Sequence, residues 1–193
     1  MIFAKIDFIN LLPFHIYIKK NIHSNQLKAI IEYKKSYPSF INNKFKKRKV
    51  DSAFISSIAS RNEKNLDFGI IAKNEVLSVL LIQGIEEDDF QSQTSNALAN
   101  VLGLKGKVLI GDKALRFFHD NQNLEKYDLA KEWKNKYNLP FVFAVLCFNK
   151  NKIRLEKLTK KFNKKHIKIP KYILEQYSKR SGVSKNNILE YLK

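Results

Sequence analysis

The stretch KVLIGDKALRFFH, residues 107–119, joins a short apolar strand to a helix through a glycine and an aspartate. We expect the strand over 107–110 and the helix from about Lys113 to His119, with Gly111 and Asp112 as its cap. The first NH groups of a helix have no partner within the helix, and they attract carboxylate or phosphate. This strand-to-helix junction is therefore a candidate anion site.

The same junction recurs twice. Ser56 and Ser57 follow the short strand expected over 50–55. The polar residues Thr94, Ser95 and Asn96 open a helix. Ordinary helix capping is the alternative interpretation of each junction. Three junctions together, with Asn10 at the end of the first strand, favour a small-anion site where the strand ends of an open α/β sheet meet.

The rest of the chain alternates in the same way. Ser36 and Pro38 begin a predicted helix that runs to about Lys49, and Asp128 begins one that runs to Lys136 around Trp133. Further apolar strands are expected over 2–9, 68–72, 76–82 and 141–148. From residue 150 onward the pattern is helical. Strands that alternate with helices predict an α/β fold.

The chain has 193 residues, and its formal charge of +18 suggests a nucleic-acid partner. Its distribution argues against one. Residues 28–49 carry a net +7 and residues 151–193 a net +10, which leaves +1 for the remainder, where every junction lies. We therefore expect a solvated basic coat on a protein that binds a small molecule, with no nucleic-acid or membrane partner.

Residues 172–193 support a rival hypothesis. They read as two helices joined at Gly182, with Ile188 and Leu189 facing inward, as in a helix–turn–helix DNA-binding protein. Any two short helices joined through glycine give the same pattern. The DNA-binding alternative stays open on this evidence alone and predicts binding that depends steeply on salt.

Several classes of protein are disfavoured. The single Cys147 excludes a disulfide framework and is expected to be inert core packing. The four histidines have no metal-ligand spacing; they are His15, His23, His119 and His166. No 18-residue apolar run is present, and the first residues lack the features of a secretion leader, so we expect a cytoplasmic protein.

Six motifs in order resemble the chorismate dehydratases of the futalosine route to menaquinone. They are DFINLLPF (7–14), VDSAFISS (50–57), TSNAL (94–98), IGDKAL (110–115), DLAKEW (128–133) and LPFVFA (139–144). The resemblance covers about residues 1–148. Residues 150–193 resemble the helical C-terminal part of the shorter, very basic members from Campylobacter-like bacteria.

The resemblance implies a type II periplasmic-binding-protein-like fold, with two α/β lobes joined by crossing hinge strands and the ligand in the cleft between them. We expect lobe I over 1–78, with the helices of 150–193 packing back on it, and lobe II over 79–149. The expected hinge strands are about 76–82 and 141–148.

The resemblance also implies a lyase that converts chorismate into 3-[(1-carboxyvinyl)oxy]benzoate and water, without metal or organic cofactor. The enolpyruvyl carboxylate would take the proton, while Asn10 orients that carboxylate or binds the departing hydroxyl. Ser56, Ser57, Thr94, Ser95 and Asn96 would hold carboxylates, and Gly111 and Asp112 would line the cleft.

Two alternatives share the implied fold. One is a cytosolic small-anion binding protein that performs no chemistry. The other is the sister enzyme of the route, which acts on cyclic dehypoxanthinyl futalosine. The motifs from Asn10 to Pro13 and over 139–144 favour the dehydratase.

Overall fold

A computed structural model of the chain describes residues 2–162 and 167–193. The chain divides into two compact units, each built from two segments. Unit 1 comprises Met1–Ile70 and Ala144–Ile169, and unit 2 comprises Ile71–Phe143 and Pro170–Lys193. The boundaries at 70/71 and 143/144 fall inside two strands, so the chain passes between the units within strands β3 and β7.

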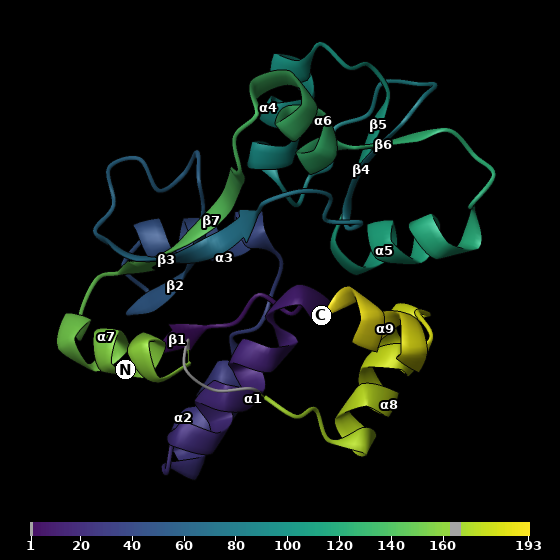
Figure 1. Cartoon of the computed structure of the whole chain (residues 1–193). Helices are drawn as coiled ribbons and strands as arrows, with labels where there is room; N and C mark the ends of the chain where they lie inside the picture. The colour runs from purple at the N-terminus through teal and green to yellow at the C-terminus, as the bar shows by residue number, and fades with distance from the viewer. Residues whose placement is uncertain (1, 163–166) are drawn as a thin grey trace. The chain divides into compact units, whose positions relative to one another are not determined.

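Unit 1 is built on a mixed four-stranded sheet in the order β1-β2-β7-β3 (Figure 1). Its elements are β1 (Phe3–Ala4), η1 (Ile9–Leu11), α1 (Leu12–Asn21), α2 (Asn25–Tyr33), α3 (Pro38–Lys46), β2 (Ser52–Ser56), β3 (Asn65–Ala72), β7 (Phe141–Phe148) and α7 (Lys152–Phe162). β1 runs parallel to β2, and β7 runs antiparallel to it. Because neighbouring parallel strands end at one edge, the residues that follow β1 and those that end β2 share that edge.

The core of unit 1 is aromatic. The ring of Phe14 on α1 lies 5.2 Å from the rings of Phe54 on β2 and Phe162 on α7, measured between centroids. Phe68 on β3 completes the cluster at 5.5 Å from Phe14. These edge-on and tilted contacts fix α1 and α7 against the sheet. They thereby set where α1 begins.

Unit 2 holds a three-stranded antiparallel sheet in the order β5-β4-β6. Its elements are β4 (Val79–Ile82), α4 (Gln93–Leu102), β5 (Lys107–Ile110), α5 (Gly111–Asp120), β6 (Lys126–Asp128), α6 (Leu129–Tyr137), α8 (Lys171–Ser181) and α9 (Lys185–Tyr191). α4 and α6 pack beside each other against the sheet, and α5 contacts β4 and β5. Val79 pairs with Ile110, so the start of β4 lies beside the junction between β5 and α5.

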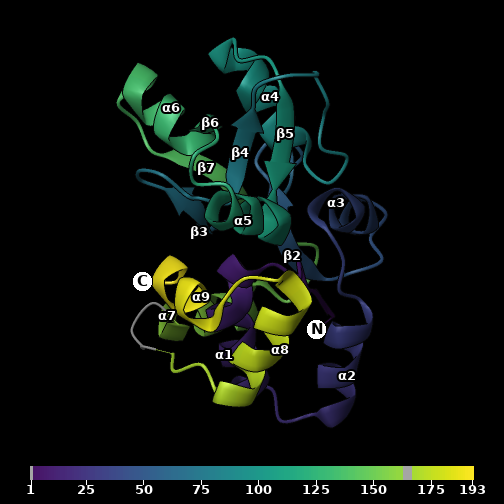
Figure 2. The same ribbon diagram turned by 90° about the vertical axis from the view of Figure 1, so that its right-hand side faces the viewer.

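α8 and α9 form a helical pair that turns at Gly182, whose φ is +74° (Figure 2). Ile188 is fully buried, as the sequence predicted, whereas Leu189 is 42% exposed and does not face inward. α8 contacts α5. Both helices belong to unit 2, whereas the sequence-based prediction packed all of 150–193 on lobe I; only α7 lies in unit 1, against α1.

The α/β class is confirmed, and the strand expected at 141–148 is β7 with the same bounds. The division expected from sequence differs from the observed one. The apolar run at 76–82 gives β4, which is the central strand of the sheet in unit 2, and β3 is the second strand that passes between the units. An isolated apolar run has the same pattern in either position.

The cap predicted for α3 was wrong, because Tyr37 and not Ser36 is its N-cap. Ile41 and Phe45 on this helix are buried, and Phe40 is 42% exposed. Pro38 does occupy the first turn, as expected. Within the residues described, none of the helices combines the length and apolar character needed to cross a bilayer.

Candidate active site

Asn10 lies in the short 3-10 helix η1, which continues directly into α1. Pro13 in the first turn of α1 fixes this transition, because its ring sets a helical φ and it has no NH to satisfy. The Oδ1 atom of Asn10 is buried, and no hydrogen-bond partner for it lies among residues 2–162 and 167–193. A buried amide oxygen without a partner is costly for folding, so it marks an acceptor that is available to a ligand.

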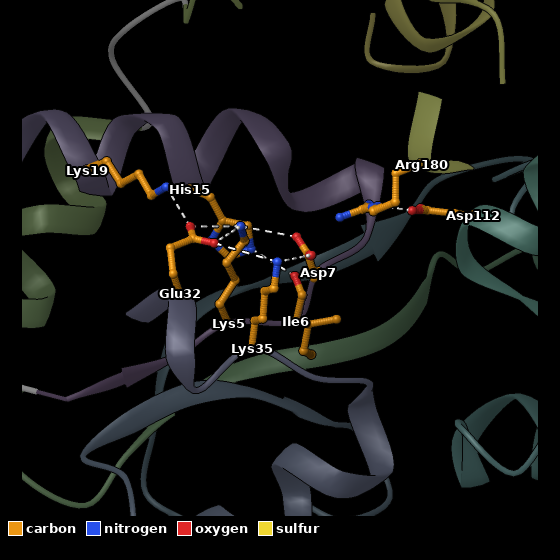
Figure 3. A network of polar contacts seen from close by, with 9 residues as sticks. All are labelled: Lys5, Ile6, Asp7, His15, Lys19, Glu32, Lys35, Asp112 and Arg180. Carbon is orange, nitrogen blue, oxygen red and sulfur yellow. Dashed lines mark hydrogen bonds and ion pairs between the residues drawn. The ribbon is translucent and has the colours of Figure 1, made fainter. Parts of the chain in front are cut away.

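A network of charged side chains holds the segment before Asn10 (Figure 3). Lys5, only 4% exposed, places its Nζ 3.1 Å from Asp7 Oδ1 and 3.1 Å from Glu32 Oε1. Lys35 reaches Asp7 Oδ2 at 3.5 Å. The NH of Ser36 donates to the Lys5 carbonyl at 2.9 Å. Residues 5–7 are therefore tied to α2 and to the loop that follows it, which limits the positions open to Asn10.

Two pKa values in this network are displaced. Partial burial acts to raise the pKa of Glu32, but hydrogen bonds and charge from Lys19 and Lys5 outweigh it, so that the pKa lies below its usual value. Burial and then the charge of Lys5 lower the pKa of His15 to about 3. The imidazole is thus neutral, and its Nε2 lies 2.9 Å from the carbonyl of Ile6. A neutral imidazole that donates there can brace the backbone just before Asn10.

Ser56 ends β2 and is held by Asn42 of α3. The Asn42 Nδ2 donates to Ser56 Oγ at 2.7 Å, and the Ser56 NH donates to Asn42 Oδ1 at 3.2 Å. Residues 57–62 form turns, with the Ser60 hydroxyl donating to the Ser57 carbonyl at 2.9 Å. The predicted helix start at Ser56–Ser57 is therefore wrong, because the local bonds close a turn that leads into β3.

The first turn of α4 contains Thr94 and Ser95, both 2% exposed, and Asn96. The N-cap, however, is Ser92, two residues before the predicted cap. Its Oγ accepts from the Ser95 NH at 3.2 Å and lies 2.9 Å from the Ser95 hydroxyl. Ser92 is an acceptable cap by residue type, but so are Thr94, Ser95 and Asn96, so residue type alone does not single it out.

Asp89 joins the start of α4 to the start of α5, a role that no local sequence pattern indicated. Its NH donates to Asn96 Oδ1 at 3.0 Å, and its Oδ2 accepts from the Ile110 NH at 3.1 Å. Lys113 on α5 lies 2.6 Å from the same Oδ2. Asp89 therefore brings the predicted residues of 94–96 and 111–112 into one neighbourhood of unit 2.

α5 begins at Gly111, two residues before the predicted start, and its N-cap is Ile110 without a side-chain cap. The φ of +66° at Gly111 is one that other residues rarely adopt. Its NH donates to the Ser78 carbonyl at 2.8 Å. Asp112 follows in the first turn, and its Oδ2 lies 2.6 Å from Nη2 of Arg180.

Ser78, which receives the Gly111 bond, is held from two sides. Its hydroxyl lies 2.7 Å from the Tyr191 hydroxyl on α9. The preceding residues 76 and 77 donate both NH groups to Oδ2 of Asp128, at 2.9 and 2.7 Å. Asp128 also caps α6 by accepting from the NH groups of Ala130 and Lys131. Burial raises the pKa of Asp128 although these four backbone bonds oppose the rise.

A hollow of about 400 Å³ in unit 2 lies at the other end of α4. Glu86, Glu87, Asp88, Gly103 and Lys105 are among the residues that line it. None of the predicted site residues does so. Three carboxylates make this hollow unfavourable for a dianion, so it is not the candidate site.

No group of three or more His, Cys, Asp or Glu side chains is placed to hold a metal ion within the described part of the chain. His166 lies outside the described residues. Cys147 is fully buried on β7, and burial raises the pKa of its thiol to about 12, which confirms the prediction of inert core packing.

Comparisons with known proteins agree with the motifs. The family model described as menaquinone biosynthesis matches residues 90–193. A chorismate dehydratase from Campylobacter jejuni subsp. jejuni serotype O:23/36 (strain 81-176) is 47% identical over 196 residues, covering 100% of this chain and 87% of that protein. The crystal structure of protein AF1704 from Archaeoglobus fulgidus has a TM-score of 0.52 at 10% identity, covering 98% of this chain and 80% of that one, which is a likeness of fold.

Proposed function

This chain belongs to the menaquinone biosynthesis family, and from that premise we propose that it is a lyase that removes water from chorismate. The observation that carries the proposal is the 47% identity, over the whole chain, with a chorismate dehydratase. The product of the proposed reaction is 3-[(1-carboxyvinyl)oxy]benzoate. The relative's match and the ordered motifs favour this function over a small-anion binding protein or a DNA-binding helix–turn–helix.

The proposed reaction is an elimination that forms an aromatic ring. The C–H bond at ring C3 breaks and its electron pair enters the ring, while the C4–O bond breaks and the hydroxyl leaves. The departing hydroxyl takes up the proton that was removed from C3 and leaves as water, so that atoms and charge balance. Aromatisation supplies the driving force, so the protein mainly has to orient the groups and exclude bulk water. The substrate's own enolpyruvyl carboxylate accepts the C3 proton in this proposal.

Asn10 is the proposed catalytic residue. Its buried Oδ1 can accept a hydrogen bond from the departing hydroxyl, and its Nδ2 can donate to the enolpyruvyl carboxylate. A neutral amide can perform both roles without repelling a dianion, whereas a carboxylate at position 10 would repel it. The bracing of residues 5–7 by Lys5 and His15 supports this assignment, because an elimination depends on a fixed orientation.

The proposed carboxylate-binding groups lie in both units. Ser56 and Ser57 lie at the end of β2, at the same edge of the sheet as the segment that follows β1 and contains Asn10. In unit 2, Asp89 gathers the first turn of α4, which carries Thr94, Ser95 and Asn96, and the first turn of α5, which carries the proposed cleft-lining residues Gly111 and Asp112. The buried hydroxyls and the helix NH groups of those turns suit a carboxylate.

The fold proposed for this function is of the type II periplasmic-binding-protein class. The support is that two strands, β3 and β7, each carry the chain from one α/β unit to the other. The ligand cleft of that class stays a prediction.

The test is incubation of the full chain with chorismate, with water loss followed by mass and by the rise of the benzoate chromophore. Asn10→Ala should lower kcat at least about a hundredfold, the scale for loss of an oriented hydrogen-bonding group in a reaction. Asn62→Ala, at an exposed turn of unit 1, is the matched control and should keep wild-type kcat.

Two outcomes would contradict the proposal. Near-normal turnover by a folded Asn10→Ala variant removes Asn10 from the catalytic role. Wild-type protein that binds chorismate, measured by calorimetry, but releases no water would instead identify a binding protein.

A further inference from the structure

Helix α8 places a guanidinium on the first turn of α5. Nη2 of Arg180 lies 2.6 Å from Oδ2 of Asp112 (Figure 3). The guanidinium carbon lies 4.2 Å from the centroid of the Tyr177 ring. The Asp112 side chain is 18% exposed and that of Arg180 37%. The guanidinium is therefore held between an aromatic face and a carboxylate, an arrangement that suits arginine and not lysine.

The docking of α8 and α9 leaves little freedom in this pair. A Cβ atom at Gly182 would lie 3.0 Å from Cδ of Arg116 on α5, so the turn after α8 approaches α5 closely. At the end of α9, the Tyr191 hydroxyl binds Ser78, the residue whose carbonyl accepts the Gly111 NH. Tyr191 therefore reaches the start of α5 through Ser78, while the turn at Gly182 lies against the middle of α5 at Arg116.

Asp112 presents an electrostatic problem at this place. Its carboxylate is favourable for α5 itself, because an acidic residue in the first turn complements the positive end of the helix dipole. The same charge repels a substrate carboxylate that approaches Gly111 and the first turn. A site for a dianion needs this charge to be cancelled.

We propose that Arg180 is a positioning residue of the substrate site: it binds and neutralises Asp112, so that the start of α5 accepts a substrate carboxylate. The proposal rests on the proposed function, since it assigns the anion to chorismate. Arg180 acts through Asp112 and need not touch the substrate. It gives the C-terminal helices, which lie outside the motifs that carried the resemblance, a role in substrate affinity.

The kinetic signature is a change in KM with little change in kcat, because the repulsion acts on binding and not on the oriented elimination. Arg180→Gln should raise the KM for chorismate about tenfold, as expected for one uncompensated charge near a partly exposed site. Asp112→Asn should lower KM, because it removes the carboxylate that repels the substrate. The double variant Asp112→Asn/Arg180→Gln should return KM to within about threefold of wild type.

Arg154→Gln is the matched control, because it removes the same charge from an exposed position on α7. Its KM should equal that of wild type. Arg180→Lys keeps a positive charge and should show a KM between those of wild type and Arg180→Gln. Thermal unfolding of each variant reports whether the helical pair remains docked.

The outcomes separate this inference from the function on which it rests. Absence of turnover in the wild-type protein contradicts the proposed function. Turnover in wild type with an unchanged KM in Arg180→Gln overturns the role of Arg180. A double variant whose KM stays as high as that of Arg180→Gln also overturns it, because Arg180 would then bind the substrate directly. If Arg180→Gln does not fold, a KM that rises in Asp112→Asn is the contradicting result.

Discussion

At the scale of single residues, α1 and the turn before it hold two buried polar atoms without a partner among the residues described, Oδ1 of Asn10 and Nδ1 of His15. They differ in physical origin. Nδ1 of His15 is the unprotonated nitrogen of a ring that is bonded through Nε2 to Ile6 and packed beside Phe3 and Phe14. The lack of a partner for that nitrogen follows from the burial of a neutral ring, whereas Oδ1 of Asn10 lies where the motifs predict a catalytic residue.

His15 makes the stability of the fold depend on pH. Its pKa in the folded protein is about 3, below the ordinary value of 6.5, mainly because of burial and then Lys5, with Asp7 and Glu32 opposing. The unfolded chain therefore binds the proton more readily. The stabilisation is complete above pH 6.5 and is lost as the pH falls toward 3. From pH 7 to pH 5 this one group should lower the free energy of unfolding by about 2 kcal/mol.

Urea unfolding at pH 7, 6 and 5 measures this loss. His15→Gln should be less stable at pH 7 but should lose about 2 kcal/mol less than wild type between pH 7 and 5. His23→Gln, at an exposed position, should keep the wild-type dependence. If His15→Gln retains the full dependence on pH, the buried neutral imidazole is not its source.

Residue identities were predictable from sequence only where a motif carried them. Asn10 and Gly111 stand out because each follows an apolar run, although the run before Asn10, predicted as a strand over 2–9, forms a strand only at Phe3–Ala4. The residues that bind the predicted site residues do not stand out in the sequence. Ser56 is bound by Asn42, and Asp112 is bound by Arg180, which lies 68 positions away along the chain. No local pattern indicates a hydrogen bond that tertiary packing creates.

At the scale of elements, strands and helices with strong local signals were predicted well. Asp128 caps α6 as its position suggested, and β7 has the predicted bounds. The errors concern how helices begin. α4 is capped by Ser92, and α5 starts at a glycine whose NH is satisfied by the carbonyl of Ser78, just before β4. Several polar residues in a row make the cap ambiguous, because each of them is an acceptable cap.

Asp89 should be a major determinant of how α4 and α5 are joined. Its side chain is fully buried and accepts from Gln91 and Ile110 besides pairing with Lys113. Asp89→Ala leaves the buried NH of Ile110 without a partner and removes a charge-assisted contact. We expect a loss of about 3 kcal/mol in the free energy of unfolding.

The control for Asp89 is its exposed neighbour. Asp88→Ala removes the same charge and should change the free energy of unfolding by less than about 0.5 kcal/mol. Urea titrations of both variants give the comparison. Equal small effects would show that Asp89 does not hold the two helices together.

At the scale of the whole molecule, the sequence predicted two α/β parts but not their membership. Which strands carry the chain from one unit to the other depends on strand order, and order is set by contacts distant in sequence. The placement of α8 and α9 in unit 2 rests on such contacts, Arg180 with Asp112 and Tyr191 with Ser78. Helical periodicity alone fixes which face of a helix is buried, not the partner it is buried against.

The charge of +18 belongs to the whole molecule and predicts a dependence on salt. The two basic segments, 28–49 and 151–193, include α3 and the helices α7 to α9. At the end of α3 and just after it, Lys46, Lys47 and Lys49 are exposed. Their summed field attracts a dianion over distances that salt screens. Raising the ionic strength from 0.05 to 0.5 M should therefore lower kcat/KM for chorismate about two- to threefold and leave kcat unchanged, because the bound substrate no longer has to approach.

The triple variant Lys46→Gln/Lys47→Gln/Lys49→Gln should lower kcat/KM at low salt and equal wild type at high salt. A large effect of salt on kcat itself would show that the charge acts on the bound state, and steep salt-dependent binding to DNA would restore the rival partner.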